Sequence, residues 1–279
     1  SQRLLPVAED RKVIGVITRT DLMMVMHEKM AKTEGGEPRA HLAKNLKNLL
    51  EERLPREIYD LLVRAGTLAS EMGFKIYLVG GIVRDMLLRI NNLDVDIVVE
   101  GDGIAFARAF SEAIGARSSA YEKYKTAVIT LPDGNHIDVA TARLEYYENP
   151  GAFPIVEQST LKLDLYRRDF TINTMAVSLN PPRFGELIDF FGAQHDIKER
   201  RVRVLHAMSF VEDPSRILRA VRFEQRYGFR LGKQTSSLVH AAVKSGLLRS
   251  VPGRRISYEI RQILGEENPI SAFARLQEL

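Results

Sequence analysis

The chain has no cysteine among its 279 residues and no long hydrophobic run. The absence of cysteine excludes disulfide bonds, thiolate zinc sites and a cysteine nucleophile, so any metal must be bound by aspartate, glutamate or histidine. No apolar run approaches the roughly 18 residues that span a bilayer, and the first six residues lack the charged-then-apolar order of a signal peptide. We therefore expect a cytoplasmic protein without a membrane partner.

Charged residues are distributed unevenly along the chain. Residues 76–197 contain 11 basic and 17 acidic side chains, whereas residues 198–261 contain 15 basic and 5 acidic ones. This segregation suits a polyanionic ligand bound by the basic segment, with cations held by carboxylates of the acidic one. An ordinary arginine-rich helical surface has the same composition, so the charge counts alone leave both interpretations open.

Hydrophobic periodicity predicts an α+β fold in which a small mixed sheet is followed by helices. Strands are predicted at residues 13–18, 75–79, 95–99, 126–131 and 135–140, and helices at 21–29, 41–53, 55–72, 82–89 and 104–114. Residues 144–166 lack periodicity, which predicts a long loop. Beyond this loop the pattern predicts helices at residues 169–178, 193–200, 212–227, 234–245 and 256–264.

Two short motifs in the predicted sheet point to phosphate and metal chemistry. Gly80 and Gly81 end a strand and begin a helix, where free backbone N–H groups and a helix N-terminus favour a phosphate. Arg84, one helical turn further on, can donate to the same phosphate. Asp94 and Asp96 are two residues apart in a strand and project from one face, where paired carboxylates suit Mg²⁺.

Asp138 is a candidate third carboxylate. Its neighbours Ile137 and Val139 are apolar, so the aspartate faces the other side of a later strand. A glycine pair or a strand-end aspartate is also common in solvated turns, but the motifs together favour a functional site. The histidines, His136 among them, show no metal-ligand spacing and are interpreted as structural or solvated residues.

These motifs resemble the signature of the polymerase β-type nucleotidyltransferases. Residues 78–88, followed by Asp94-Val95-Asp96, are similar in particular to the class II tRNA nucleotidyltransferase and bacterial poly(A) polymerase family. Residues 167–176 resemble the family's ribose-recognition motif, and residues 212–223 resemble its base-reading helix. The resemblance extends over residues 74–264.

The resemblance implies two-metal nucleotidyl transfer in a polymerase-like head. Asp94 and Asp96, with Asp138 as the third carboxylate, would hold two Mg²⁺ ions. Gly81, Arg84 and Arg168 would bind the triphosphate, and Arg168, Asp169 and Asn173 would also contact the ribose 2′-hydroxyl. The four motifs occur along the chain in the order that the family shows.

The base-reading segment also has a physical interpretation. On a helix, Asp213 and Arg216 share a face and can present a Watson–Crick-like edge of one acceptor and one donor to a free base. Arg219 and Arg222 continue this face at three-residue steps and can reach the triphosphate. The alternative is a ladder of surface ion pairs on an exposed helix. Ile260 occupies a position after Glu259 where the family commonly has arginine, which leaves the role of that helix open.

Four parts are expected along the chain. Residues 1–33 resemble the last half of a CBS domain, and residues 34–73 are a linker with connecting helices. Residues 74–190 form the nucleotidyltransferase head, and residues 191–279 form a helical neck and the start of a body. The chain is expected to be a shortened form, because the family's body and tail domains extend beyond it.

The expected activity is transfer of AMP from ATP to the 3′ end of tRNA without a nucleic-acid template, with the basic segment binding the acceptor end. By this resemblance, the full length of residues 144–166 argues against an enzyme that adds only CC, and the CBS-like start favours one that adds only the terminal A. The alternatives are a CCA-adding enzyme that also uses CTP, a poly(A) polymerase, a small-molecule nucleotidyltransferase and a non-catalytic RNA-binding regulator.

Overall fold

The computed structural model describes residues 4–9, 12–18, 44–146 and 155–279. The chain divides into two compact units, Ser1–Leu42 and Ala43–Leu279. In the first unit, β1 (Leu4–Glu9) pairs antiparallel with β2 (Lys12–Thr18). The strand predicted at 13–18 is thus confirmed, whereas the helix predicted at 21–29 lies outside the described residues. The CBS interpretation of this unit stays a prediction.

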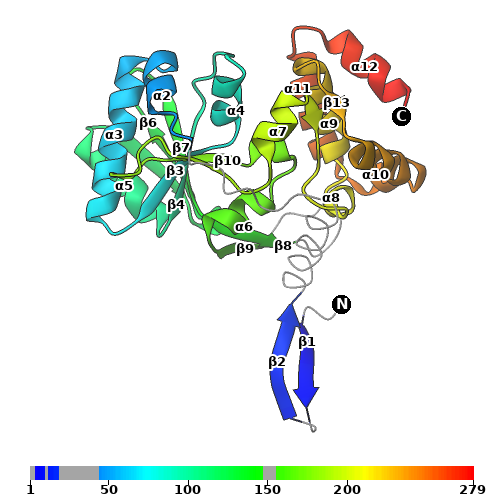
Figure 1. The fold of residues 1–279 in the computed structure, drawn as a ribbon, viewed down its shortest axis with the longest axis horizontal. Helices are drawn as coiled ribbons and strands as arrows, with labels where there is room; N and C mark the ends of the chain where they lie inside the picture. Colours follow the sequence, from blue (N-terminus) through cyan, green and yellow to red (C-terminus); the bar gives the residue numbers. More distant parts are fainter. Residues whose placement is uncertain (1–3, 10–11, 19–43, 147–154) are drawn as a thin grey trace. The chain divides into compact units, whose positions relative to one another are not determined.

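The second unit is built on a seven-stranded mixed sheet (Figure 1). Its strand order is β11-β10-β3-β4-β7-β6-β5. The strands are β3 (Lys75–Val79), β4 (Val95–Glu100), β5 (Arg117–Tyr121), β6 (Thr126–Thr130), β7 (His136–Thr141), β10 (Met175–Ser178) and β11 (Leu187–Asp189). Among these described strands, β4 and β7 form the parallel pair and all other neighbours are antiparallel.

One face of the sheet is covered by helices. The helices of this half are α2 (Lys47–Arg53), α3 (Arg56–Glu71), α4 (Gly81–Leu87) and α5 (Gly103–Ala113). Phe106 and Phe110 of α5 and Leu62 of α3 join one buried core with Ile97 of β4 and Val139 of β7. Because side chains alternate along a strand, Asp96 and Asp138 lie on the opposite face, away from this core.

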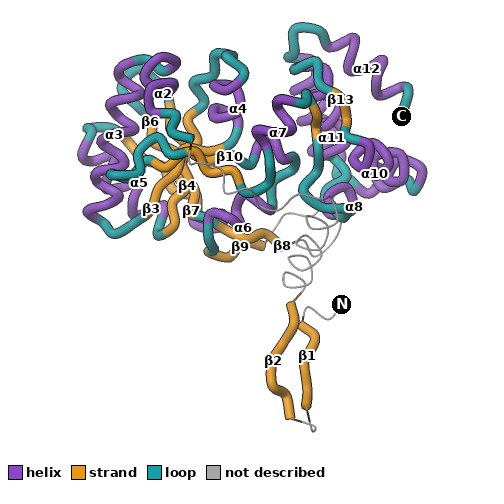
Figure 2. Tube along the Cα trace, viewed as in Figure 1, coloured by secondary structure: helices purple, strands orange, loops and turns teal. Residues whose placement is uncertain are grey.

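The chain beyond residue 209 is mostly helical (Figure 2). The elements that follow the sheet are α7 (Ala193–Lys198), β12 (Arg201–Val202), α8 (Ser209–Glu212), α9 (Arg216–Arg226), β13 (Arg230–Leu231), α10 (Lys233–Lys244), α11 (Gly253–Leu264) and α12 (Pro269–Gln277). Three short 3₁₀ turns lie at Glu122–Tyr124, Thr171–Asn173 and Leu247–Ser250. A second core of Phe170, Ile172, Phe210 and Phe223 joins α8 and α9 to the end of the head.

Two predicted segments were wrong in type. Residues 144–166 are not a continuous loop, because β8 (Arg143–Tyr146), β9 (Ile155–Gln158) and α6 (Leu161–Tyr166) lie within them. Residues 169–178 are not a helix but a 3₁₀ turn followed by β10. Every residue of β10 is buried between β3 and β11, and periodicity cannot separate a fully buried strand from a buried helix.

Two predicted helices have different bounds. The helix predicted at 41–53 begins only at Lys47, and the helix predicted at 212–227 is broken into α8 and α9. The break coincides with Pro214, because the residue before a proline is disfavoured in the α conformation. Asp213 is accordingly extended, with φ −142° and ψ 91°. Among the described residues, no helix combines the length and apolar character needed to cross a membrane.

Candidate active site

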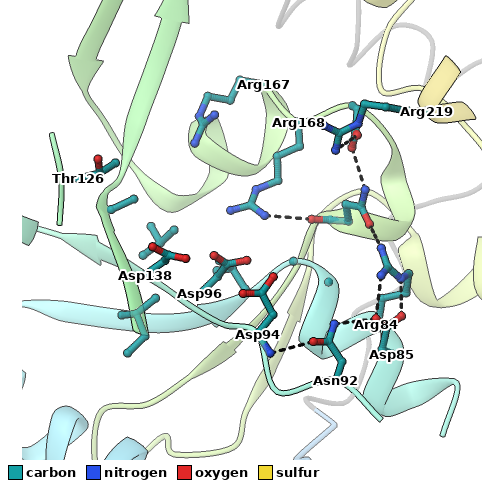
Figure 3. Close-up of a pocket in the computed structure, with 18 of the residues that line it drawn as sticks. Arg84, Asp85, Asn92, Asp94, Asp96, Thr126, Asp138, Arg167, Arg168 and Arg219 are labelled. Carbon is teal, nitrogen blue, oxygen red and sulfur yellow. Dashed lines mark hydrogen bonds and ion pairs between the residues drawn. The ribbon is translucent and has the colours of Figure 1, made fainter. Parts of the chain in front are cut away.

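The three predicted carboxylates meet where β4 and β7 run side by side (Figure 3). Asp96 and Asp138 are direct partners in the parallel register of these strands, and Asp94 directly precedes β4. The apolar residues Val95 and Ile97 point into the core, so the strand alternation turns Asp94 and Asp96 to the open face. The geometry predicted for the three aspartates is confirmed.

His136, an exposed residue at the start of β7, also lies beside this cluster. One ligand atom each of Asp94, His136 and Asp138 lie within 4.8 Å of one another. His136 and Asp138 are two residues apart in β7 and share a face, and this spacing was the available signal in the sequence. Two carboxylates and an imidazole at this separation can hold a divalent cation.

The electrostatics of the cluster favour a bound cation. Burial, together with the charges of Asp94 and Asp138, raises the pKa of Asp96 to about 6, although Arg168 opposes this rise. Burial also raises the pKa of Asp138. The carboxylates therefore resist carrying charge together unless a positive ion lies among them. Hard oxygen donors of this kind fit Mg²⁺.

The turn between β3 and α4 requires glycine at its first position. Gly80 has φ +76° and ψ −131°, a conformation that residues with a side chain rarely adopt. A Cβ atom at Gly80 would lie 2.7 Å from Nη1 of Arg168 and 3.8 Å from Oδ2 of Asp96. The absence of a side chain thus lets the guanidinium of Arg168 approach the carboxylates. Gly81 follows as the first residue of α4.

Arg84 is buried and held by protein partners. Its Nε and Nη2 donate to the two carboxylate oxygens of Asp85 at 2.8 and 2.9 Å, and its Nη1 donates to Oδ1 of Asn173. The amide of Asn173 in turn donates to Oδ1 of Asp169 at 2.9 Å. Arg84, Asn173 and Asp169 therefore form one network at the wall of the site. Asp169 and Asn173 do not lie on the helix predicted at 169–178, because a 3₁₀ turn and β10 occupy this segment.

Asp169 connects this network to α9. Its carboxylate pairs with Nη2 of Arg219 at 2.7 Å. Asp169 is buried, but Arg219 and the hydrogen bond from Asn173 outweigh the burial and lower its pKa. The side chain therefore stays ionised and fixes Arg219 at the edge of the cavity.

Sequence reasoning missed Asp164 of α6, which is fully buried. It accepts from Nη2 of Arg167 at 2.7 Å and from Nη2 of Arg168 at 3.3 Å. These arginines and a backbone hydrogen bond from Arg143 lower its pKa in spite of burial. Asp164 thereby holds Arg168 beside the carboxylate cluster.

Asp213 and Arg216 line the site, but not as neighbours on one helical face. Asp213 lies in the extended turn before α9, and Arg216 is the first residue of that helix. Nη2 of Arg255, from α11, pairs with Oδ2 of Asp213, while Oγ of Ser215 donates to Oδ1 at 2.6 Å. Nη1 of Arg216 donates to Oγ of Ser209 at 2.7 Å. Arg255 was not predicted, and its contact shows that α11 contributes a basic side chain to the site.

Glu259 of α11 balances the arginines of α9. Its carboxylate oxygens lie 3.7 Å from Nη1 of Arg219 and 3.9 Å from Nη2 of Arg222, and Arg222 also pairs with Glu266 at 3.3 Å. Arg219 and Arg222 thus lie at the predicted place but in a network of ion pairs.

All twelve predicted site residues line a single cavity of about 840 Å³. Its size is typical of sites for ligands of nucleotide dimensions. The cavity joins the carboxylates of the sheet on one side to the arginines of α9 on the other. The sequence of residues 76–203 matches the protein family described as the poly A polymerase head domain.

Known proteins resemble the chain beyond this segment. An A-adding tRNA nucleotidyltransferase of Geobacter sulfurreducens is 47% identical over 284 residues, which cover 100% of this chain and 32% of that protein. The chain contains the head domain of the poly(A) polymerase family. The family resemblance predicted from the motifs is thereby confirmed.

Solved structures of this family share the fold. A CCA-adding enzyme in its apo form superposes with a TM-score of 0.81 and 48% identity, covering 84% of this chain and 55% of that one. The Thermotoga maritima CCA-adding enzyme in complex with tRNA superposes with a TM-score of 0.76 and 44% identity, covering 84% and 54%. The chain therefore spans about a third of the Geobacter protein and about half of these two nucleotidyltransferases.

Proposed function

We propose that this chain catalyses transfer of AMP from ATP to the 3′ end of a tRNA that ends in CC, without a nucleic-acid template. The observation that carries the proposal is the single cavity in which three carboxylates face the arginines of α9. The Geobacter sulfurreducens relative is named as an A-adding tRNA nucleotidyltransferase. This name favours ATP over CTP as the substrate.

The reaction forms a bond between the primer 3′ oxygen and the α-phosphorus of ATP and breaks the bond to pyrophosphate. Asp94, Asp96 and Asp138 would hold two Mg²⁺ ions, with His136 as a further donor. When bound, such ions activate the attacking hydroxyl and stabilise the charge on the leaving group. The side chains of this cluster, which offer mainly carboxylate oxygens, fit Mg²⁺ as a ligand set.

The chain's own residues would bind and orient the nucleotide. Gly81 presents its backbone N–H at the start of α4, and Arg168, whose guanidinium lies against Gly80, would bind the triphosphate. Arg219 and Arg222 add positive charge on the α9 side. Asp169 and Asn173, tied to Arg84, would face the ribose 2′-hydroxyl.

Base selection would rest on Asp213 and Arg216. Asp213 supplies an acceptor whose direction is set by Ser215 and Arg255, and Arg216 supplies donors from the start of α9. An acceptor beside a donor can read the edge of a free base. The basic segment 198–261 would bind the tRNA acceptor end through phosphates, which predicts strong salt dependence.

The division into a head at 74–190 and a neck at 191–279 is part of the proposal. α2 and α3 share the core of the head, so the connecting helices would act as a support for the sheet.

Incorporation of labelled ATP and CTP into three tRNA transcripts tests the proposal. The transcripts end before the first C, after CC and after CCA. Addition of A to the CC-ended transcript alone is expected. Addition of C and then A to the shortest transcript would instead indicate a CCA-adding enzyme, and long A tails a poly(A) polymerase. Absence of incorporation would favour a non-catalytic RNA-binding role.

A further inference from the structure

A buried carboxylate of α4, to which the proposed chemistry assigns no role, is the centre of a hydrogen-bond network. Asp85 is fully buried and accepts from two nitrogens of Arg84. It also accepts from Nδ2 of Asn92 at 2.7 Å and from the hydroxyl of Tyr227 at 3.0 Å. These donors come from three separate segments of the chain, which meet at this one carboxylate.

Asn92 extends the network to the carboxylate cluster. While its amide nitrogen donates to Asp85, its Oδ1 accepts from the backbone N–H of Asp94 at 2.8 Å (Figure 3). A side-chain acceptor bonded two residues ahead is an Asx turn, which fixes the local backbone. The turn therefore sets the position from which Asp94 enters β4.

Tyr227 extends the network in the other direction, to the helix that carries the predicted base-reading arginines. It directly follows α9, and its ring lies 4.7 Å from the guanidinium carbon of Arg84. Burial raises the pKa of Tyr227 to about 12, so its hydroxyl keeps the proton that it donates to Asp85. The hydrogen bond from the Tyr227 hydroxyl therefore makes the position of Asp85 depend on how α9 packs against the head.

We propose that Asp85 and Asn92 are positioning residues that couple the seating of α9 on the head to the geometry of the metal-binding Asp94. The path runs from the Tyr227 hydroxyl through the Asp85 carboxylate and the Asn92 amide to the Asp94 backbone. It rests on the proposed function in one respect, namely that Asp94 binds a cation. The partners of metal ligands commonly tune metal affinity by 10- to 100-fold.

The coupling gives the network a role beyond support of the fold. A nucleotide bound at α9 and a metal bound at Asp94 would therefore affect each other's binding through the same hydrogen bonds. A merely structural network would stabilise the head without changing the affinity of the cluster for a metal. Metal affinity, measured without nucleotide or RNA, therefore separates the two roles.

The experiment measures the dissociation constant of Mn²⁺ from the amplitude of the free-ion electron paramagnetic resonance signal. Asn92→Ala removes both bonds of the amide, and Asn92→Ser keeps a short acceptor for the Asp94 N–H while losing the reach to Asp85. Tyr227→Phe removes only the hydroxyl. Asp85 is left unchanged, because loss of its charge would strand Arg84 in the interior.

Asn45→Ala is the matched control. Oδ1 of Asn45 also accepts from a backbone N–H two residues ahead, that of Lys47 at 2.8 Å, and its amide donates to the carbonyl of Phe184 at 3.0 Å. Asn45 does not line the cavity. Circular dichroism and thermal unfolding verify that each variant is folded at the temperature of the titration.

We expect Asn92→Ala to weaken Mn²⁺ binding by about tenfold and Tyr227→Phe by about two- to fivefold, with Asn45→Ala unchanged. In the Asn92→Ser background, Tyr227→Phe should have no further effect, because the path is already interrupted. The coupling would be overturned if Asn92→Ala or Tyr227→Phe bound Mn²⁺ with wild-type affinity. It would also be overturned if the loss of affinity in the Asn92→Ser, Tyr227→Phe double variant equalled the product of the losses in the two single variants. The Asp94→Asn variant tests the proposed metal site separately. Unchanged Mn²⁺ binding in this variant would show that Asp94 does not bind the ion, and the proposed function and the coupling would then both fail.

Discussion

The glycine turn before α4 makes a quantitative prediction for Gly80→Ala. The backbone at Gly80 has φ +76° and ψ −131°, and an alanine held there costs about 2 kcal/mol. For a unit of this size the cost corresponds to a lowering of the melting temperature by about 4–8 °C. The new Cβ would also lie 2.7 Å from Nη1 of Arg168, closer than real Cβ contacts, so the guanidinium must move.

Displacement of Arg168 should lower activity as well as stability. Misplacement of a positioning group by about 1 Å can cost roughly 100-fold in rate, so we expect kcat/KM for ATP to fall by about 10- to 100-fold. Gly134→Ala is the matched control, because Gly134 also has a positive φ, +89°, but has nothing within 4 Å of an added Cβ. It should lose stability and keep its kcat/KM.

Thermal unfolding and steady-state ATP incorporation into a CC-ended tRNA transcript measure the two effects separately. If Gly80→Ala kept a kcat/KM within about twofold of that of Gly134→Ala, the close approach of Arg168 to the turn would have no part in binding the triphosphate. The reasoning from the site geometry would then be refuted.

Three further substitutions test other contacts. Asp164→Ala should lower the free energy of unfolding by about 3–5 kcal/mol in urea titration, because Arg167 and Arg168 lose a buried partner; wild-type stability would refute this. Arg255→Ala should lower the preference for ATP over CTP by about tenfold in competition assays, because Asp213 loses a contact that orients it; an unchanged preference would argue against base reading by Asp213. His136→Ala should weaken Mn²⁺ binding more than Mg²⁺ binding in calorimetry, because imidazole favours the softer ion; unchanged binding of both ions would remove His136 from the site.

The sheet and its carboxylates were predictable because they follow from short-range rules. Strand alternation places Asp94 and Asp96 on one face, and the apolar neighbours of Asp138 place it opposite the core. The parallel pairing of β4 with β7, which makes Asp96 and Asp138 direct partners, depends on the order of strands. No local pattern in the sequence encodes that order.

The secondary structure predicted from the sequence is wrong at three places, each for a physical reason. The strand β10 was taken for a helix because all four of its residues are buried, which removes the alternation that would reveal it. The polar edge strand β5 was missed because its sequence, Arg117-Ser118-Ser119-Ala120-Tyr121, contains no apolar alternation. Asp213 was placed on a helix although Pro214 favours an extended residue before it.

The network around the site was the least predictable part. Asp164 and Arg255 reach the predicted residues from other elements, and nothing in their local sequence indicates the partner. The sequence around Glu259 gives no sign that its carboxylate pairs with Arg219 of another helix. Such contacts depend on how separate helices pack, which periodicity does not specify.

The role of the paired carboxylates is tested by incorporation of labelled AMP from ATP into a CC-ended tRNA transcript in Mg²⁺. The wild-type chain is compared with the Asp94→Asn and Asp96→Asn variants. We expect one AMP per transcript for the wild type, a loss of at least about 100-fold in each variant, and no incorporation after chelation by EDTA. Wild-type rates in either variant would contradict this expectation, because the paired carboxylates would then not be the centre of the reaction.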